Sequence, residues 1–363
     1  MEILKLLIAI YCAIFFIGAI IYWGSFDVFN TEDYKGKISV IIAYRNEKNN
    51  LPKLVECLQK QDYQGEMEFI FVDDHSNDQG PQVLENSSDK RFVLLKNDID
   101  KIGKKQALKI GVQNATGEIL IFTDADCTMT EKWVRLLSKP FTNPNISMVL
   151  GPFIYKKADN LLGTFQYMEQ LLLWGLSYLT GKYKMAVMCN GANMAVRKQI
   201  YLTHQESIRY DIATGDDVFL LQKISSIDAN SVVFVESKLL QVQSDPETNF
   251  YKFIHQKLRW ASKAGNFKNI HANIIGLVMM SYLGLMIYLI VTFNVKLVVI
   301  KTFFELMFIY IIKNKQDYHK SSILKSVYFY ITCIISLNLY PFYAFTIGTL
   351  SKLKKYDWKG RKY

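Results

Sequence analysis

The segment Ile38-Ser-Val-Ile-Ile-Ala43-Tyr-Arg-Asn-Glu47 sets the pattern of the first half of the chain: an apolar run rich in β-branched residues, closed by polar side chains. Similar apolar runs follow at 68–72, 91–95 and 119–122, and polar stretches of helical length separate them, the first over 50–60. Strands that alternate with helices in this way are typical of βαβ units. The pattern therefore predicts an α/β fold with a mostly parallel sheet.

Polar side chains follow three of these predicted strands. They are Arg45, Asn46 and Glu47 after the first strand, Asp74 after the second, and Asp124 and Asp126 after the fourth. In open parallel sheets, ligands bind outside the carboxyl ends of the strands. We therefore expect these side chains to converge on one pocket.

Asp124 and Asp126 form the motif Asp-Ala-Asp directly after the fourth predicted strand. Two carboxylates on one side of an extended loop can hold a hard divalent cation that also binds phosphate oxygens. Such a cation, Mg²⁺ or Mn²⁺, would neutralise the charge that builds up on a departing nucleoside diphosphate. A solvated turn is the competing interpretation, and the position after a buried strand favours metal binding.

Two further motifs are candidates for binding a nucleotide. Asp74 ends the second predicted strand, where a carboxylate can accept a hydrogen bond from a uracil N–H or a ribose hydroxyl; a cap for the next helix is the alternative, and the two are compatible. Gly103-Lys104-Lys105 precedes a helix, whose free N–H groups could hold phosphate together with Lys104. A solvated lysine pair explains this second motif equally well.

The motif Thr214-Gly-Asp216-Asp217 begins an apolar helical run. Sugar transfer with inversion needs a carboxylate that takes a proton from the acceptor hydroxyl on the side opposite the leaving group. We therefore expect Asp217 to be the general base, with Asp216 as its neighbour. A plain helix N-cap is the competing interpretation.

The motif Gln256-Lys-Leu-Arg259-Trp260 lies in a basic stretch over 249–268 that has the pattern of an amphipathic helix. Gln256 and Trp260, four residues apart, share one face of that helix. Trp260 offers an apolar platform for a sugar ring, and Arg259 a fixed charge for a pyrophosphate. An interfacial tryptophan among snorkelling basic residues is the competing interpretation.

Two apolar segments have the length and composition of membrane helices. Residues 3–23 have the length of roughly 20 residues that a helix needs to cross a bilayer. The aromatic pair Tyr22-Trp23 at the end of this run favours an uncleaved anchor over a signal peptide. Residues 272–293 carry no charge and are long enough to span.

Two more segments are expected spans with polar interruptions. Residues 296–312 include Lys301 and Glu305, four apart on one helical face, which would have to pair or face protein. Residues 327–350 are uncharged but contain Asn338 and Pro341.

The net charge of +10 is a membrane-surface feature rather than a sign of nucleic acid, because the basic residues cluster beside the apolar segments, at 252–268 and 352–362. The positive-inside rule places both clusters in the cytoplasm. Three spans after a cytoplasmic domain would leave the tail outside, so we expect 296–312 or 327–350 to be re-entrant, interfacial or otherwise paired. The five scattered cysteines indicate neither a disulfide framework nor a zinc site, which fits a reducing cytoplasm.

These patterns divide the chain into five parts. They are an N-terminal transmembrane anchor (1–24), a cytoplasmic catalytic domain (36–248), a basic interfacial helix (249–270), a transmembrane region of two to three helices (271–350) and a basic tail (351–363). The expected location is the cytoplasmic (inner) membrane, with several crossings.

Together, the motifs from about residue 38 to residue 260 resemble those of the family 2 glycosyltransferases. These are inverting, GT-A-fold enzymes that include the cellulose, hyaluronan and chitin synthases and many bacterial lipid and polysaccharide glycosyltransferases. The resemblance implies metal binding by Asp124 and Asp126, a base at Asp217, and Gly191, Ala192 and Asn193 beside the donor sugar and the acceptor. Residues implied to bind the nucleotide-sugar are Ala43, Arg45, Asn46, Glu47, Asp74, Lys104, Asp124, Gln256, Arg259 and Trp260.

Two positions depart from the family pattern. Ala43 stands where a proline is usual, and Gly-Asp-Asp replaces the commoner Glu-Asp before the base. Neither change removes a reacting group, but the second leaves Asp216 and Asp217 as alternatives for the base.

The leading hypothesis is a membrane-bound inverting glycosyltransferase that moves a sugar from a UDP-sugar or another nucleotide-sugar to a lipid-linked or glycan acceptor, in glycolipid or cell-surface polysaccharide synthesis. A processive polysaccharide synthase is the nearer alternative, although so few helices make a narrow channel unless the protein forms oligomers or has an export partner. An inactive relative, serving as a membrane assembly or sugar-binding subunit, would have lost a reacting carboxylate. The sequence retains each of them.

Overall fold

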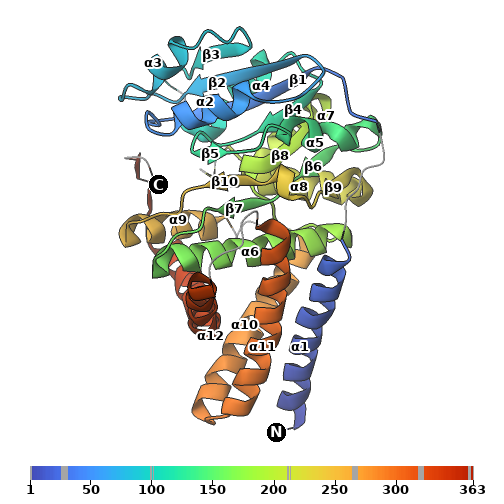
Figure 1. Ribbon diagram of the computed structural model, residues 1–363, viewed down its shortest axis with the longest axis vertical. Helices are drawn as coiled ribbons and strands as arrows, with labels where there is room; N and C mark the ends of the chain where they lie inside the picture. The colour runs from blue at the N-terminus through green and yellow to red at the C-terminus, as the bar shows by residue number, and fades with distance from the viewer. Residues whose placement is uncertain are drawn as a thin grey trace.

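The first predicted strand, β1 (Ile38–Tyr44), lies inside the largest sheet of the computed structural model. The structure describes residues 2–25, 32–98, 100, 102–210, 212, 214–263, 269–317, 323–358 and 361–362. Figure 1 shows three levels: an α/β domain, helices that lie crosswise beneath it, and long helices that extend away from this layer.

The largest sheet has seven strands in the order β3-β2-β1-β4-β8-β6-β9. β1, β2 (Met67–Asp73), β3 (Phe92–Lys96) and β4 (Ile119–Phe122) run parallel to one another. β8 (Met194–Arg197) is antiparallel to β4 and to β6 (Met148–Leu150), and β9 (Val232–Phe234) is parallel to β6. The predicted α/β fold with a mostly parallel sheet is therefore confirmed, and β8 is the strand that reverses direction.

Side chains of β1 alternate between two apolar cores, because helices cover both faces of the sheet. Val40 and Ile42 lie in the core that includes α2 (Leu51–Gln59), whereas Ile41 lies in the core that includes α4 (Lys104–Asn114). Residue 111 of α4 is a glycine, and a Cβ there would lie 2.6 Å from Cγ2 of Ile41. Each of these fully buried β1 side chains contributes about 1.5–3 kcal/mol by leaving water.

The other elements of the domain are short. A second sheet has the order β5-β10-β7, with β5 (Cys127–Thr128) antiparallel and β7 (Phe153–Tyr155) parallel to β10 (Val242–Ser244). The remaining α-helices are α3 (Gly80–Glu85), α5 (Trp133–Ser138), α7 (Lys198–His204) and α8 (Asp216–Ile227). Short 3-10 helices lie at Lys139–Thr142, Gly191–Asn193, Gln205–Ile208, Ala229–Ser231 and Lys238–Leu240.

Two helices form the crosswise layer beneath the domain, α6 (Leu161–Lys182) and α9 (Phe250–Ser262) (Figure 1). The helix predicted over 249–268 is described from Phe250 to Ser262, and residues 264–268 of that prediction lie outside the described residues. α9 turns Phe253, Lys257 and Leu258 inward, which is the buried face of an amphipathic helix.

Four long helices flank the domain: α1 (Glu2–Trp23), α10 (Ile270–Val291), α11 (Val295–Gln316) and α12 (Ile323–Leu353). Among the described helices, α1, α10 and α12 are long and apolar enough to cross a membrane, and α11 is not. The expectation of membrane-compatible helices on both sides of the catalytic domain is therefore confirmed. A two-stranded ladder, β11 (Asp357–Trp358) with β12 (Arg361–Lys362), follows α12, and residues 359, 360 and 363 of the predicted basic tail lie outside the described residues.

Two of the charges that interrupt the segment 296–312 are paired with each other. Nζ of Lys301 lies 2.7 Å from Oε2 of Glu305, and both side chains are almost completely buried. Tyr11 of α1 and Tyr282 of α10 donate their hydroxyls to Oε1 of Glu305 at 2.6 and 2.7 Å. Lys301 and Glu305 were expected to pair or to face protein, and they do both. Their contacts join α1, α10 and α11.

A buried carboxylate joins the domain to these helices. Glu236, which follows β9, accepts hydrogen bonds from the hydroxyl of Tyr22 and the indole N–H of Trp174, both at 2.6 Å. Gln316 of α11 donates to its other oxygen at 2.5 Å. Three helices, α1, α6 and α11, are therefore tied to one loop of the domain.

Candidate active site

A cavity of about 1010 Å³ opens at the carboxyl ends of β1, β2 and β4. It continues past the start of α8 to walls formed by α6, α9 and α12. Most of the residues predicted from the sequence line this cavity: Ala43, Arg45, Asn46, Glu47, Asp74, Lys104, Asp124, Asp126, Gly191, Asp216, Asp217, Gln256, Arg259 and Trp260. The structure thus brings together motifs that lie more than 200 residues apart in the chain.

Asp74 is held at the end of β2 by the loop before α4. Its Oδ1 accepts hydrogen bonds from Nδ2 of Asn97 (2.9 Å) and from the backbone N–H of Gly103 (3.0 Å). Gly103 has a φ of 116°, which favours glycine, and it is the N-cap of α4. The N-cap of α3 is Gln79, so Asp74 does not cap the next helix.

Arg45 and Asn46 connect the end of β1 to the end of β2. Nη1 of Arg45 donates to the carbonyl oxygens of Asp74 (2.9 Å) and His75 (2.7 Å). Oδ1 of Asn46 accepts from the backbone N–H of Asn77 at 2.9 Å. Glu47 is 7% exposed and accepts from Asn50 at 2.6 Å. These side chains fix the shape of the two loops that border the cavity.

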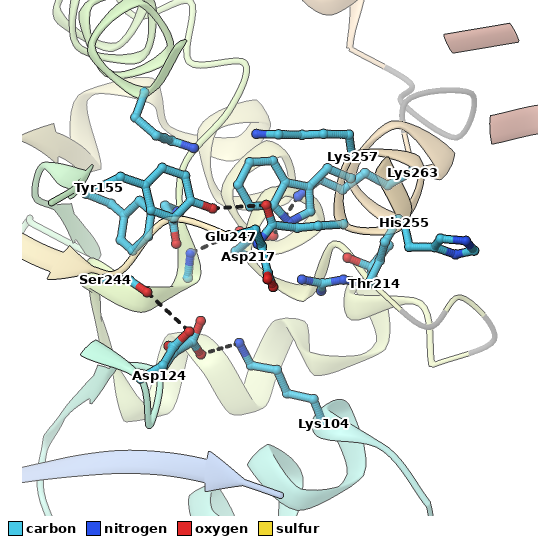
Figure 2. Close-up of a pocket in the computed structure, with 18 of the residues that line it drawn as sticks. Lys104, Asp124, Tyr155, Thr214, Asp217, Ser244, Glu247, His255, Lys257 and Lys263 are labelled. Atoms are coloured by element: carbon cyan, nitrogen blue, oxygen red, sulfur yellow. Dashed lines mark hydrogen bonds and ion pairs between the residues drawn. The ribbon is translucent and has the colours of Figure 1, made fainter. Parts of the chain in front are cut away.

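Lys104 and Lys105 are not a solvated pair. Lys104 reaches across the cavity wall and forms an ion pair with Oδ1 of Asp124 (Figure 2). Burial acts against the charged form of Lys104, but Asp124 and Asp216 outweigh it and raise the pKa of this lysine. Lys105 points the other way and donates to the carbonyl oxygens of Ile208 (2.8 Å) and Arg209 (2.9 Å).

The carboxylates of Asp124 and Asp126 both face the cavity from the turn after β4. Oδ2 of Asp126 accepts from Oγ of Ser244 at 3.2 Å, which ties it to β10. Within the described residues, no three His, Cys, Asp or Glu side chains are grouped to hold a metal by themselves. Two oxygen ligands with room beside them fit Mg²⁺ or Mn²⁺, because such ions take the rest of their ligands from water and phosphate.

Asp216 and Asp217 begin α8 on the opposite side of the cavity. Gly215, with a φ of 87°, is the N-cap, so neither carboxylate fills the ordinary capping position. Oδ2 of Asp217 accepts from the backbone N–H of Gly191 at 3.0 Å, and Oδ1 lies 3.4 Å from Nζ of Lys263. Figure 2 shows Asp217, Lys257 and Lys263 across the cavity from Lys104 and Asp124.

The two carboxylates of this pair have different electrostatic surroundings. Burial, reinforced by the charge of Asp217, raises the pKa of Asp216. Burial acts in the same direction on Asp217, but Lys263 and the backbone N–H of Val218 outweigh it and hold the pKa of Asp217 below its ordinary value. Asp217 is therefore ionised, as a general base must be, at any pH near neutrality.

Four residues of the Gln-Lys-Leu-Arg-Trp motif of α9 line the cavity: Gln256, Lys257, Arg259 and Trp260. Gln256 accepts a hydrogen bond from the hydroxyl of Tyr155 at 3.1 Å. Lys257, inside the motif, lies 4.2 Å above the ring of Trp260 and forms a buried ion pair with Glu169 of α6. Burial lowers the pKa of Lys257, against the effect of Glu169. The motif thereby fixes α9 to α6 while Trp260 stays at the cavity.

Ala192 and Asn193 are completely buried and lie outside the cavity lining, unlike Gly191. Oδ1 of Asn193 accepts from the indole N–H of Trp133 at 2.9 Å, and Nδ2 donates to the carbonyl oxygens of Pro152 and Leu240 at 2.8 Å. Asn193 therefore binds two neighbouring segments of the domain together, and of the predicted three-residue segment only Gly191 reaches the site.

The cavity residues that were not predicted from the sequence include Tyr155, Glu169, Lys257 and Lys263. Glu169 could have been identified from the sequence, because it is a single acidic residue within an apolar helix, and a buried acid needs a partner. Lys257 and Lys263 were visible only as members of a basic stretch.

The side of the cavity that faces the long helices is more apolar than the side that holds the carboxylates. It is formed by Leu173 and Trp174 of α6, Trp260 of α9, and Tyr340, Tyr343 and Ile347 of α12. One cavity thus contains charged groups that attract phosphate and, on α6, α9 and α12, apolar groups that attract hydrocarbon.

The chain is similar in sequence to known proteins. Residues 39–203 match the family model for glycosyl transferase family 2. A 4,4'-diaponeurosporenoate glycosyltransferase of Staphylococcus haemolyticus is 30% identical over 154 residues, 40% of this chain and 40% of that protein. An N-acetylglucosaminyltransferase of Azorhizobium caulinodans is 28% identical over 129 residues, 34% of this chain and 32% of that protein. The chain spans less than half of the length of these relatives.

Among solved structures, a mannosyltransferase from Pyrobaculum calidifontis in complex with GDP-Man and Mn²⁺ is similar over 96% of each chain, with a TM-score of 0.58 and 15% identity. At this identity the likeness concerns the fold. Because it extends over nearly the whole chain, it includes the flanking helices as well as the sheet. The GT-A fold expected from the sequence motifs is confirmed.

Proposed function

We propose that the protein is a membrane-bound inverting glycosyltransferase of family 2, because residues 39–203 match the model for glycosyl transferase family 2. Its donor is a nucleotide-sugar, for which we propose a UDP-sugar, and its acceptor is a lipid-linked molecule of glycolipid or cell-surface polysaccharide synthesis. The observation that carries the proposal is that one cavity is lined both by the carboxylates of Asp74, Asp124, Asp126, Asp216 and Asp217 and by apolar side chains of α6, α9 and α12.

The nucleotide is proposed to bind where β1, β2 and β4 end. Asp74, oriented by Asn97 and Gly103, offers a carboxylate to a uracil N–H or a ribose hydroxyl. Arg45 and Asn46 keep the loops around it in place. Further along the cavity, Lys104 and Arg259 supply positive charge for a pyrophosphate.

Asp124 and Asp126 are the residues proposed to hold Mg²⁺ or Mn²⁺ together with the diphosphate. When bound, the cation supplies Lewis-acid stabilisation of the leaving nucleoside diphosphate. The ion pair of Lys104 with Asp124 and the hydrogen bond of Ser244 to Asp126 keep both carboxylates on the cavity side before the donor arrives.

Asp217 is proposed to accept the proton of the acceptor hydroxyl. It lies across the cavity from Lys104 and Asp124, so an acceptor placed against it approaches the sugar from the side opposite the phosphates (Figure 2). This is the geometry of an in-line displacement, in which the anomeric configuration inverts. Gly191 and Val218, whose N–H groups donate to the Asp217 carboxylate, keep it oriented.

The acceptor is proposed to enter from the membrane. Tyr340, Tyr343 and Ile347 of α12 and Trp260 of α9 line the same cavity as Asp217. An acceptor with a hydrocarbon anchor could keep this anchor among the apolar helices while its hydroxyl reaches the base. In this arrangement 36–248 is the catalytic domain on the cytoplasmic face of the inner membrane, 249–270 the interfacial helix, and 1–24 and 271–350 the membrane-embedded parts.

The proposal is tested with purified protein in detergent. A panel of nucleotide-sugars is supplied with Mn²⁺, and release of the nucleoside diphosphate is measured with and without a membrane lipid extract. We expect release from one donor, and we expect the lipid extract to increase it. No release from any donor, with the extract present, would contradict the proposal, and a ladder of products of increasing length would identify a processive synthase instead of a single-transfer enzyme.

A further inference from the structure

The helix α12 touches the catalytic domain near its beginning and the interfacial helix α9 near its end. Near its beginning, Nζ of Lys325 lies 2.7 Å from Oδ2 of Asp159, in the loop before α6. Near its end, Ile347 packs in one apolar cluster with Leu258 of α9. A helix of 31 residues is about 46 Å long, so α12 is long enough to cross a membrane, yet both of its ends lie on the same side.

Contacts along the middle of α12 show the same course. The ring of Phe329 lies 5.8 Å from that of Tyr167, and the ring of Tyr343 lies 5.1 Å from that of Phe165, so two well-separated parts of α12 pack against the same turn of α6 and the helix crosses beneath it. Figure 1 shows α12 nearly end-on below α6, whereas α1, α10 and α11 extend away from the domain. α12 therefore runs beneath the domain instead of away from it.

The other long helices have one end at the domain and one end far from it. Lys315, near the end of α11, donates to the carbonyl oxygen of Tyr22 near the end of α1, at 2.6 Å. Asn269, before α10, donates to the carbonyl oxygen of Ala186 at 3.2 Å. At the opposite end, the turn between α10 and α11 exposes Phe293, which is 87% accessible. α10 and α11, with 22 residues each, are about 33 Å long, which matches the hydrocarbon thickness of a bilayer.

From these contacts we infer that α12 is embedded in the membrane leaflet next to the catalytic domain and does not cross the bilayer. The three crossings are α1, α10 and α11. This inference rests on the membrane-bound location under the proposed function. It reverses what composition alone indicates, because α12 has the composition of a span and α11 does not. α11 can cross because Lys301 and Glu305 neutralise each other inside the protein.

The outer side of α12 has the chemistry of a lipid-facing surface. Leu324, Val327, Ile331, Ile335 and Leu339 are each at least half exposed and recur every three or four residues, which places them on one side of the helix. α1 and α10 also expose large apolar side chains. The hydrocarbon of the leaflet is therefore the partner that we assign to it.

The polar residues of α12 are accommodated by protein. Nδ2 of Asn338 donates to the carbonyl oxygen of Ile334 (2.7 Å) and to Oγ1 of Thr302 in α11 (3.2 Å). After the helix, the backbone N–H of Asp357 donates to Nδ1 of His255 in α9 at 2.8 Å. The C-terminal segment thus returns to the catalytic domain, which satisfies the positive-inside rule for a tail with this many basic residues.

Introduced cysteines test this course directly in sealed membrane vesicles, using a maleimide that does not cross membranes, before and after permeabilisation. Lys325→Cys and Lys354→Cys mark the two ends of α12, Lys53→Cys marks the catalytic domain, and Thr292→Cys marks the turn between α10 and α11. All four side chains are on the surface. The parent chain, with its native cysteines, gives the background in parallel.

We expect Lys325→Cys, Lys354→Cys and Lys53→Cys to be labelled from one side of the membrane and Thr292→Cys from the other. Labelling of Lys354→Cys together with Thr292→Cys would show that α12 crosses and would overturn the inference. Labelling of Lys53→Cys and Thr292→Cys from the same side would refute the crossings of α10 and α11. Labelling requires no sugar transfer, so these outcomes are separate from failure of the proposed activity.

Discussion

Replacing Asp217 with asparagine removes the proposed base with little change of shape. The side chain keeps one oxygen, which can still accept from the backbone N–H of Val218. Its NH₂ group then faces the backbone N–H of Gly191, which now donates to Oδ2 at 3.0 Å. Loss of a hydrogen bond to a charged acceptor costs about 1.5–3 kcal/mol of stability, so the variant should fold and melt at a lower temperature than the wild type.

The effect on sugar transfer should be much larger than the effect on donor binding. General base catalysis contributes about 10²- to 10⁴-fold, which corresponds to about 3–5 kcal/mol in the activation free energy. The predicted assay result is a fall of that size in the rate of nucleoside diphosphate release with the lipid acceptor present. Donor affinity, measured by calorimetry with Mn²⁺, should stay at the wild-type value because Asp217 lies across the cavity from Asp74 and Asp124.

Asp216→Asn is the matched control, since it removes the same charge one residue earlier. We expect a smaller loss of transfer from it, because Asp216 is the member of the pair whose pKa is raised by burial and by its neighbour. Wild-type rates in the Asp217→Asn protein would refute the assignment of the base. A larger loss in Asp216→Asn than in Asp217→Asn would move that role to Asp216.

Three other changes test separate parts of the site and the membrane region. Asp126→Ala should weaken donor binding in the presence of Mn²⁺ by about tenfold or more and leave metal-free binding unchanged; calorimetry with and without EDTA measures both. Lys263→Met removes the cation that lowers the pKa of Asp217, so the pKa of Asp217 should rise. The acid limb of the pH profile of kcat/KM should then move to higher pH. If the limb does not move, Asp217 is not the group that determines it. Lys301→Met leaves the Glu305 carboxylate buried without its positively charged partner, and it should cost about 3–5 kcal/mol of stability in a detergent melting assay. The double variant Lys301→Met, Glu305→Leu should recover most of this stability.

The strands at the start of the domain could be predicted because their signals are local. The apolar runs of β1 to β4 and the helices between them are visible within a few residues each, and β4 has the predicted bounds. β8 could not be predicted in this way. Met194–Arg197 has its place only through pairing with β4 and β6, which are at least 40 residues away in the chain.

The course of α12 could not be predicted from the sequence, for a similar reason. Hydropathy measures whether a helix can enter a membrane, and it contains no information on where the helix ends. That information lies in the contacts of Lys325 with the domain and of Ile347 with α9. The expectation that 296–312 or 327–350 is not an ordinary span came from the basic tail, and the contacts of α12 favour the second segment.

The candidate site was predictable where motifs follow strands. Asp74, Asp124 and Asp126 converge because parallel strands end at one edge, a rule that needs no coordinates. The ion pair of Lys263 with Asp217 joins residues 46 apart, and that of Lys257 with Glu169 joins residues 88 apart, so neither leaves a pattern in the sequence. Asn193 is the opposite case. It belongs to a recognisable motif, but its buried side chain holds the core together and does not line the site.

The central claim is that one cavity joins a nucleotide-sugar to an acceptor in the membrane. Its most direct test supplies the donor with a radiolabelled sugar to membranes that contain the protein, then extracts the products with organic solvent. We expect label in the organic phase as one lipid-linked species, formed in step with nucleoside diphosphate release. Label that stays in the aqueous phase as free sugar or as a soluble product, while the diphosphate is released, would contradict it.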